Sequence, residues 1–266
     1  METPPQQETE SQSESQSPFP GVRSGLSPVA PFRWISRGLD DFKACPTASM
    51  FYGCCFAAMG FVLNVVLARY YQYVSALACG FLLLGPFLAI GIYEVSRRRQ
   101  KGLMCALRPT LAAWRSNAGN IGVYSLILSV IFLVWARASL VAFALFYTSE
   151  MPTLEGFLRQ VLSLQNAEFL VVYAGVLLIF GSLVYAVSVV SIPLMLDRDQ
   201  DSVTAMITSF LALVNNFPAM VVWAVLILAF TGIGFATLYI GLIFTIPLIG
   251  HATWHAYQEV VEPRSS

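Results

Sequence analysis

The chain has 266 residues, of which 57% are hydrophobic and only 11% charged, whereas soluble domains are about 45–50% apolar and about 25% charged. Its formal net charge is zero, so no global field favours nucleic acid or an acidic partner. These values exclude an ordinary soluble domain and predict an integral membrane protein whose main partner is the lipid bilayer.

The chain begins with a polar segment. Residues 1–30 are rich in Ser, Gln, Glu and Pro and offer little to bury, so a disordered cytoplasmic tail is predicted. The segment 32–46, "FRWISRGLDDFKACP", then places Trp34, Ile35, Leu39 and Phe42 at helical spacing. That pattern predicts a short helix lying in the membrane interface. The membrane domain is expected to extend over 31–262, with 263–266 as a second disordered end.

Six apolar runs follow, each about long enough to cross a hydrocarbon core of about 30 Å. They cover roughly 48–68, 73–94, 121–137, 168–195, 218–232 and 235–255. We therefore expect an all-α polytopic membrane protein with six transmembrane helices. The connection 138–167 contains "LEGFLRQVLSL", for which an amphipathic helix is predicted. Arg137 is expected at the far interface, where its side chain can reach the headgroups.

The orientation is predicted from the basic cluster "SRRRQKG". Arg97, Arg98, Arg99 and Lys101 follow the second run, and such clusters favour the cytoplasmic side of short loops. With six spans, both termini are then cytoplasmic.

Three prolines occupy similar places in the even-numbered runs. Pro86, Pro193 and Pro247 each lie late in a span, and each removes a helix hydrogen bond, so kinks are predicted. Amphipathic stretches at 32–46, 103–118 and 202–217 precede the odd-numbered spans. This pattern suggests three tandem units, each an interfacial helix followed by a transmembrane hairpin. The kinks could line a cavity or could serve packing alone.

The two histidines of the chain, His251 and His255, are four residues apart and share one helix face. They can be a metal-ligand pair, a proton-handling pair, or interfacial residues beside Trp254. "HATWH" lacks the glutamate of a zinc-protease HExxH helix, and one helix turn cannot place both histidines on opposite sides of a haem. A metal site would need one further ligand, for which the candidates are Glu259, Tyr257, Asp197, Asp199 or a second subunit.

Other chemistry is weakly indicated. The five cysteines, which are Cys45, Cys54, Cys55, Cys79 and Cys105, form no CxxC pair and are interpreted as small apolar residues. The sequence contains no Walker loop, GxSxG or GxGxxG motif, and no acidic residue falls at mid-bilayer depth. We therefore expect neither an enzyme nor an ion-coupled pump, and no cofactor.

Three blocks resemble a known family: "RWISRGLDDFKACPTASMFYG", "GFLLLGPFLAIGIYEVSRRRQKG" and "PLIGHATWHAYQEVV". They are similar to the bacterial integral membrane family called domain of unknown function 2189 (DUF2189), over about 32–262. The residues that carry the resemblance are Trp34, Gly38, Asp40 or Asp41, Gly85, Pro86, Phe87, Gly250, His251, Trp254 and His255. It implies a bacterial inner-membrane protein with no assigned activity.

The leading hypothesis for function is a non-enzymatic scaffold, assembly or interaction protein whose partner is another membrane protein or a second copy of the chain. One alternative is a permeation protein for small solutes or metals. The other is a respiratory accessory protein that binds metal or haem through His251 and His255.

Overall fold

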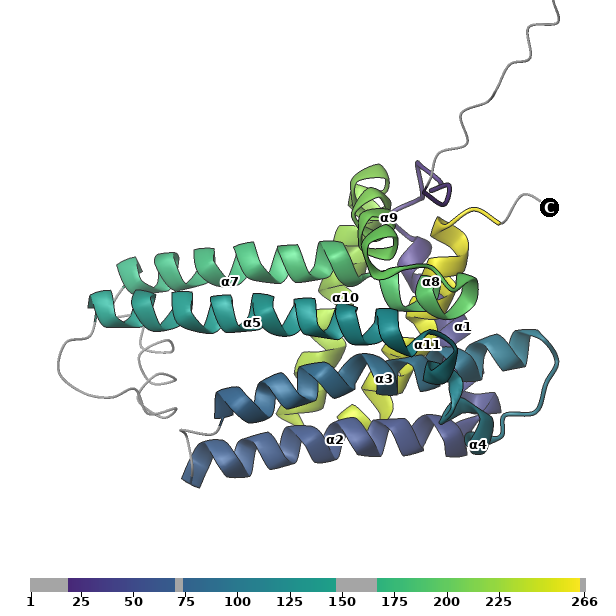
Figure 1. Ribbon diagram of the computed structural model, residues 1–266, viewed down its shortest axis with the longest axis horizontal. Coiled ribbons are helices and arrows are strands. Elements are labelled where there is room, and N and C mark those ends of the chain that lie inside the picture. Colours follow the sequence, from purple (N-terminus) through teal and green to yellow (C-terminus); the bar gives the residue numbers. More distant parts are fainter. Residues whose placement is uncertain (1–18, 70–73, 147–166, 264–266) are drawn as a thin grey trace, which may run out of the picture.

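The computed structural model describes residues 19–69, 74–146 and 167–263, and these residues form helices joined by short connections (Figure 1). Helices predominate because each satisfies its own backbone hydrogen bonds, as a membrane requires. Their bounds are α1 (Ala30–Ala44), α2 (Pro46–Arg69), α3 (Val74–Gln100), α4 (Leu107–Thr110), η2 (Ala113–Asn117), α5 (Ala118–Phe146), α7 (Ala167–Ser188), α8 (Ser191–Arg198), α9 (Ser202–Asn215), α10 (Phe217–Ala236) and α11 (Leu242–Val260).

Five stretches of the described residues are long and apolar enough to cross a membrane. They are Pro46–Val66, Leu77–Gln100, Leu107–Phe146, Ala167–Arg198 and Phe217–Ala236. The predicted sixth span, 235–255, is not among them. The chain turns between α10 and α11, and the second half of α11 carries the polar side chains of "HATWHAYQE", which lower its hydropathy. The third span is also longer than expected, because α5 continues past Arg137 to Phe146.

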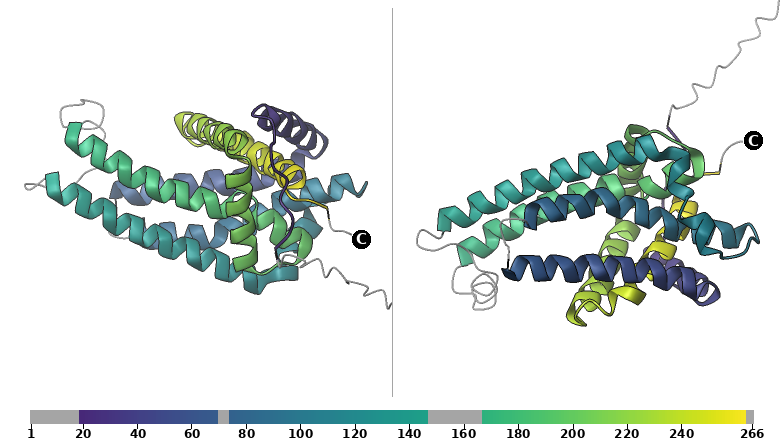
Figure 2. Two further views of the ribbon diagram at one scale, coloured as in Figure 1. Left: turned by 90° about the horizontal axis from the view of Figure 1, so that it is seen from above. Right: turned by 60° about the horizontal axis from the view of Figure 1, so that its bottom comes forward.

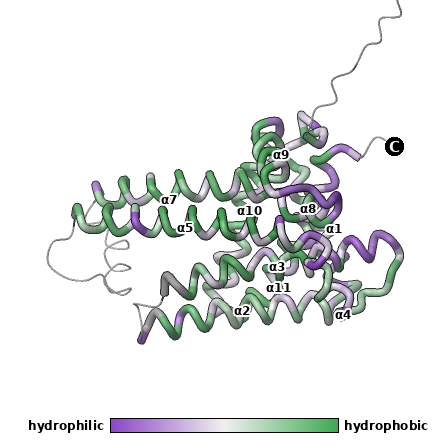
Figure 3. Tube along the Cα trace, in the orientation of Figure 1, coloured by the Kyte–Doolittle hydropathy of each residue, from purple (hydrophilic) through white to green (hydrophobic). Residues whose placement is uncertain are grey.

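The long helices give the molecule its shape. Helices α2, α3, α5 and α7 extend along the long axis, and the α10–α11 hairpin runs across them (Figures 1 and 2). Leu126 of α5 and Leu178 of α7 are among many exposed apolar side chains, and their helices are mostly hydrophobic along their length (Figure 3). Hydrophilic residues gather at the end where α1, α8 and α11 meet. The fold thus has an apolar body and one polar end.

The first and last described segments of the chain meet at this polar end. Val22 and Val261 form an isolated antiparallel bridge, and the backbone N–H of Arg23 donates to the carbonyl of Val260 at 2.8 Å. Most of the predicted tail, residues 1–18, lies outside the described residues. Residues 21–23, however, pair with the C-terminal segment, and the N–H of Leu26 donates to Oδ1 of Asn216 at 3.0 Å.

Helix α1 differs from the predicted interfacial helix. Its buried residues are Ala30, Pro31, Trp34, Gly38 and Asp41, and they face α11. A Cβ on Gly38 would lie 2.8 Å from the backbone N of Ala252, so only glycine permits this approach. Leu39, expected on the membrane face with Trp34, is exposed on the other side. Packing against α11, which the sequence pattern does not reveal, therefore decides the orientation of α1.

The other two amphipathic stretches have different outcomes. The stretch 202–217 forms α9, and its N-terminus is capped by Asp201, which accepts from the N–H groups of Val203 and Thr204 at 3.0 Å. The stretch 103–118 forms two short pieces, α4 and η2, instead of one helix. The helix predicted within 138–167 lies outside the described residues from position 147 onward.

Candidate functional site

The two histidines lie in the interior of the polar end and not in an interfacial belt. His251 has no exposed surface, and His255 is 7% exposed. Both are on α11, four residues apart, and they face α1, α2 and α3. We call their surroundings the histidine cluster, which consists of Asp41, Ser49, Ser96, Arg99, His251 and His255.

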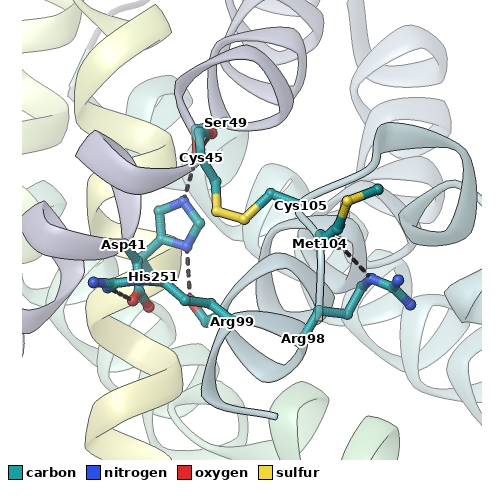
Figure 4. The surroundings of a disulfide bond; sticks show 9 residues. Asp41, Cys45, Ser49, Arg98, Arg99, Met104, Cys105 and His251 are labelled. Carbon is teal, nitrogen blue, oxygen red and sulfur yellow. Dashed lines mark hydrogen bonds and ion pairs between the residues drawn. A yellow bond between two sulfur atoms is a disulfide. The ribbon is translucent and has the colours of Figure 1, made fainter. Parts of the chain in front are cut away.

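His251 lies between two hydroxyl groups. Its Nε2 is 2.8 Å from Oγ of Ser49 on α2, and its Nδ1 is 2.7 Å from Oγ of Ser96 on α3. Figure 4 shows the ring between these helices, with its contact to Ser49. A neutral imidazole has one donor and one acceptor, and a hydroxyl can supply either complement. Both ring nitrogens of His251 are therefore already used by the protein.

His255 is paired with a buried carboxylate. Its Nε2 lies 2.9 Å from Oδ2 of Asp41 on α1, and Arg99 of α3 forms an ion pair with the other carboxylate oxygen. Burial favours a higher pKa for Asp41, but hydrogen bonds from His255, Ser96 and Arg99 outweigh it and lower the pKa below its ordinary value of 3.8. Asp41 is therefore a charged group that joins α1, α3 and α11.

A pocket of about 290 Å³ opens beside this pair. Its lining residues are Arg37, Asp40, Asp41, Arg99, Gln100 and His255. The carboxylates and guanidinium groups are balanced in number, and Asp41 and Arg99 are already paired with each other. The pocket therefore has polar character without a strong preference for one sign of charge.

The residues proposed as additional metal ligands serve other contacts. Glu259 accepts from the indole Nε1 of Trp34 at 3.0 Å and pairs with Arg33 at 2.5 Å. Tyr257 donates its hydroxyl to Asp197 at 2.8 Å. Within the described part of the chain, no group of three or more His, Cys, Asp or Glu side chains could hold a metal ion.

The arginines of the basic cluster contact other parts of the fold. Arg97 bonds Glu94 at 2.6 Å and also reaches the carbonyl of Leu196 at 3.2 Å. Arg98 donates to the carbonyl of Met104 at 3.2 Å. These contacts tie α3 to α8 and to the connection after α3, whereas Lys101 is exposed in the turn that follows.

The three prolines are all buried. Pro86 and Pro247 lie inside the continuous helices α3 and α11. Pro193 instead lies in the first turn of α8, after the chain has left α7 at Ser188. A proline is well tolerated there, because the first turn of a helix has no internal partner for that N–H.

The pairing of two cysteines is the main structural feature that was not predicted from the sequence. Cys45 and Cys105, 60 positions apart in sequence, form a disulfide (Figure 4). No short spacing motif links them, because the pair depends on a contact between two segments that are far apart in the sequence. Cys54, Cys55 and Cys79 are free.

Part of the chain matches the model of a known protein family. A family model described as "Predicted integral membrane protein (DUF2189)" matches residues 74–197. Residues 74–197 are therefore similar to the DUF2189 family. The match extends from the start of α3 to α8, a little under half of the chain, and confirms the resemblance seen in the "GFLLLGPFLAIGIYEVSRRRQKG" block. No curated protein and no solved structure matches the chain.

The histidine cluster lies partly inside and partly outside the matched region. Ser96 and Arg99 are inside the matched region, whereas Asp41, His251 and His255 are outside it. The matched region therefore supplies Ser96 and Arg99, and α1, α2 and α11 supply the other members of the cluster.

Proposed function

We propose that this protein is a non-enzymatic scaffold or interaction protein of the bacterial inner membrane. The supporting observation is that the ionisable side chains of the histidine cluster bind one another. Asp41 is held by His255 and Arg99, and His251 by Ser49 and Ser96. These mutual contacts hold α1, α2, α3 and α11 together, which makes the polar end a rigid platform.

The surface of this end supplies groups for a partner. The Arg33 and Arg37 side chains on α1 are about half exposed, and Phe32 is 56% exposed beside them. Arginine and aromatic side chains are enriched in protein interfaces. A second membrane protein, or another copy of this chain, is the partner we expect.

We further propose that both termini are cytoplasmic. Residues 21–23 pair with 260–262, which supports an even number of crossings between these two segments. The arginine-rich end of α3 lies at the same end of the molecule, which favours the cytoplasm. The five candidate spans become six if α11 also crosses the membrane, in the direction opposite to α10.

The tandem arrangement remains part of this proposal. The element order repeats a short helical piece followed by a pair of longer helices: α1 before α2 and α3, α4 and η2 before α5 and α7, and α9 before α10 and α11. Such an order supports three related units. It is compatible with duplication of one hairpin.

In-membrane photocrosslinking tests the scaffold function. A photoreactive phenylalanine analogue replaces Phe32 on α1 and, as the matched control, Leu178, which is 68% exposed on α7. We expect a discrete protein adduct from position 32 and only lipid adducts from position 178. Absence of an adduct at 32, together with solute or metal flux through liposomes containing the purified protein, would instead favour the permeation hypothesis.

A further inference from the structure

The connection between α3 and α4, which contains Cys105, begins with a sharp reversal of the chain. Helix α3 ends in a turn in which Gly102 has φ 67°, and the N–H of Leu103 donates to the carbonyl of Arg98 at 2.9 Å. This is the pattern of a Schellman cap, which reverses the chain after a helix. Met104 is then 81% exposed, and Cys105 is partly buried in a segment without regular structure.

The partner cysteine is placed by a proline. Helix α1 ends at Ala44, and Cys45 has φ −127° and ψ 53°, because the residue before a proline is disfavoured in helical conformation and Pro46 begins α2. Cys45 is 2% exposed and packs in a small core with Tyr52. Its Cα lies 5.6 Å from that of Cys105, within the range of about 4.4–6.8 Å that disulfides require.

We propose that Cys45 and Cys105 form a redox-active pair that reversibly clamps the α3–α4 connection to the α1–α2 junction. The proposal is independent of the scaffold function but rests on the cytoplasmic orientation proposed above. It commits to a low-molecular-weight disulfide as oxidant and to the corresponding thiol as reductant.

The exchange balances in two steps. The Cys105 thiolate, the more accessible of the two, attacks one sulfur of the small disulfide, forms a mixed disulfide and releases one thiol. The Cys45 thiolate then attacks the Cys105 sulfur, forms the internal bond and releases the second thiol. The protein loses two electrons and two protons, and the small disulfide gains them. Reduction is the same sequence in reverse.

The basic residues beside the pair argue for reversibility. Arg98 contacts the connection itself, and Arg97 and Arg99 precede it on α3. In the orientation that these arginines favour, the cysteines face the cytoplasm. Disulfides there are usually transient, because the thiol pool keeps cysteines reduced.

Reduction of the disulfide removes the covalent link to the α3–α4 connection but leaves two hydrogen bonds that hold it to the fold. The bond from Arg98 to the Met104 carbonyl and the bond from the Tyr52 hydroxyl to Oγ1 of Thr110 at 2.8 Å do not depend on the disulfide. They hold the segment at Met104 and at Thr110. Residues 105–109 between these two contacts lose their covalent anchor at Cys105, so their mobility depends on the redox state.

Limited proteolysis of the full chain in membranes tests the pairing directly. Lys101 and Gly102 are exposed in the turn, and trypsin cleavage after Lys101 separates Cys45 from Cys105. We expect the two fragments to migrate together on a non-reducing gel after treatment with oxidised glutathione, and apart after reduced glutathione. In Cys105→Ser the fragments should separate under both conditions. Fragments that separate from the native chain despite the oxidant would overturn the pairing.

Thiol counting tests reversibility. In a variant with Cys54→Ala, Cys55→Ala and Cys79→Ala, acid quenching followed by a maleimide label should report no free thiol after oxidised glutathione and two after reduced glutathione. A matched variant that keeps Cys54 and Cys79 and lacks the other three should report two throughout. Two labels in the oxidised sample would overturn the proposal, and so would a bond that reduced glutathione in native membranes leaves intact.

Discussion

His255 Nε2 lies 2.9 Å from Asp41 Oδ2, across 214 positions of sequence. The carboxylate is 2% exposed and the imidazole 8% exposed. This contact joins the first described helix of the membrane domain to the last. It is also the point from which the stability of the polar end can be tested.

Replacing Asp41 with asparagine should destabilise the protein markedly. The change removes the charge that faces Arg99 and His255 and leaves them buried or half-buried without their partner. Removal of one partner from a buried pair typically costs about 3–5 kcal/mol, and we expect the lower part of that range because the Arg99 side chain is 38% exposed. Thermal unfolding in mild detergent measures the effect. Asp40→Asn, at the exposed neighbouring position, is the control and should change the free energy of unfolding by less than about 0.5 kcal/mol.

The Asp41 carboxylate should make a contribution to the free energy of unfolding that is lost in acid. The pKa of Asp41 is lowered in the folded protein, so its contribution is fully present above its unfolded value of about 3.8 and is lost as the pH falls through the lower folded value. The difference in unfolding free energy between the native protein and Asp41→Asn should therefore be constant between pH 5 and about pH 4 and shrink below it. Unfolding curves of both proteins from pH 5 to pH 3 measure this. A difference that grows with acidity would contradict the assignment.

The close approach of α1 to α11 should be sensitive to a single methyl group. A Cβ on Gly38 would meet the backbone N of Ala252 at 2.8 Å, and backbone cannot move aside as a flexible side chain can. We expect Gly38→Ala to lower the stability by about 1–3 kcal/mol, as overpacking does. Gly85→Ala on α3 is the matched control, since no atom lies within 4 Å of a Cβ there. Equal melting temperatures for the two variants would show that the α1–α11 contact is looser than described.

The metal hypothesis for the two histidines is tested by elemental analysis and an absorption spectrum of the detergent-purified protein. Because Ser49 and Ser96 use both nitrogens of His251, we expect no stoichiometric metal and no haem band. The double variant His251→Ala/His255→Ala is the comparison. Stoichiometric metal that disappears in the double variant would favour the accessory-protein hypothesis instead.

The sequence predicted the long helices well because their apolar runs determine them locally. The runs at 48–68 and 73–94 correspond to α2 and α3, and the stretch 202–217 to α9. Local patterns failed where distant segments decide the outcome. Trp34 looked like a membrane anchor, but it packs inside because α11 covers it, and its indole reaches Glu259.

For the same reason, the sequence predicted only part of the histidine cluster. The spacing of His251 and His255 indicated a shared helix face, but neither the hydroxyls of Ser49 and Ser96 nor the Asp41 carboxylate could be assigned to it without the fold. One signal was available. Trp34, Gly38 and Asp41 recur at intervals of four and three, which places a small residue and an acid on one stripe of α1.

The pairing of α1 with α11 also has a consequence for how the protein is made. A ribosome delivers α1 first and α11 last, so the Trp34–Glu259 and Asp41–His255 contacts cannot form until the intervening chain has entered the membrane. Until then the acid of α1 and the small face around Gly38 lack their partner. A chain that stalls before α11 therefore lacks the helix that completes the polar end, and α1 reaches its final packing only after α11 has been made.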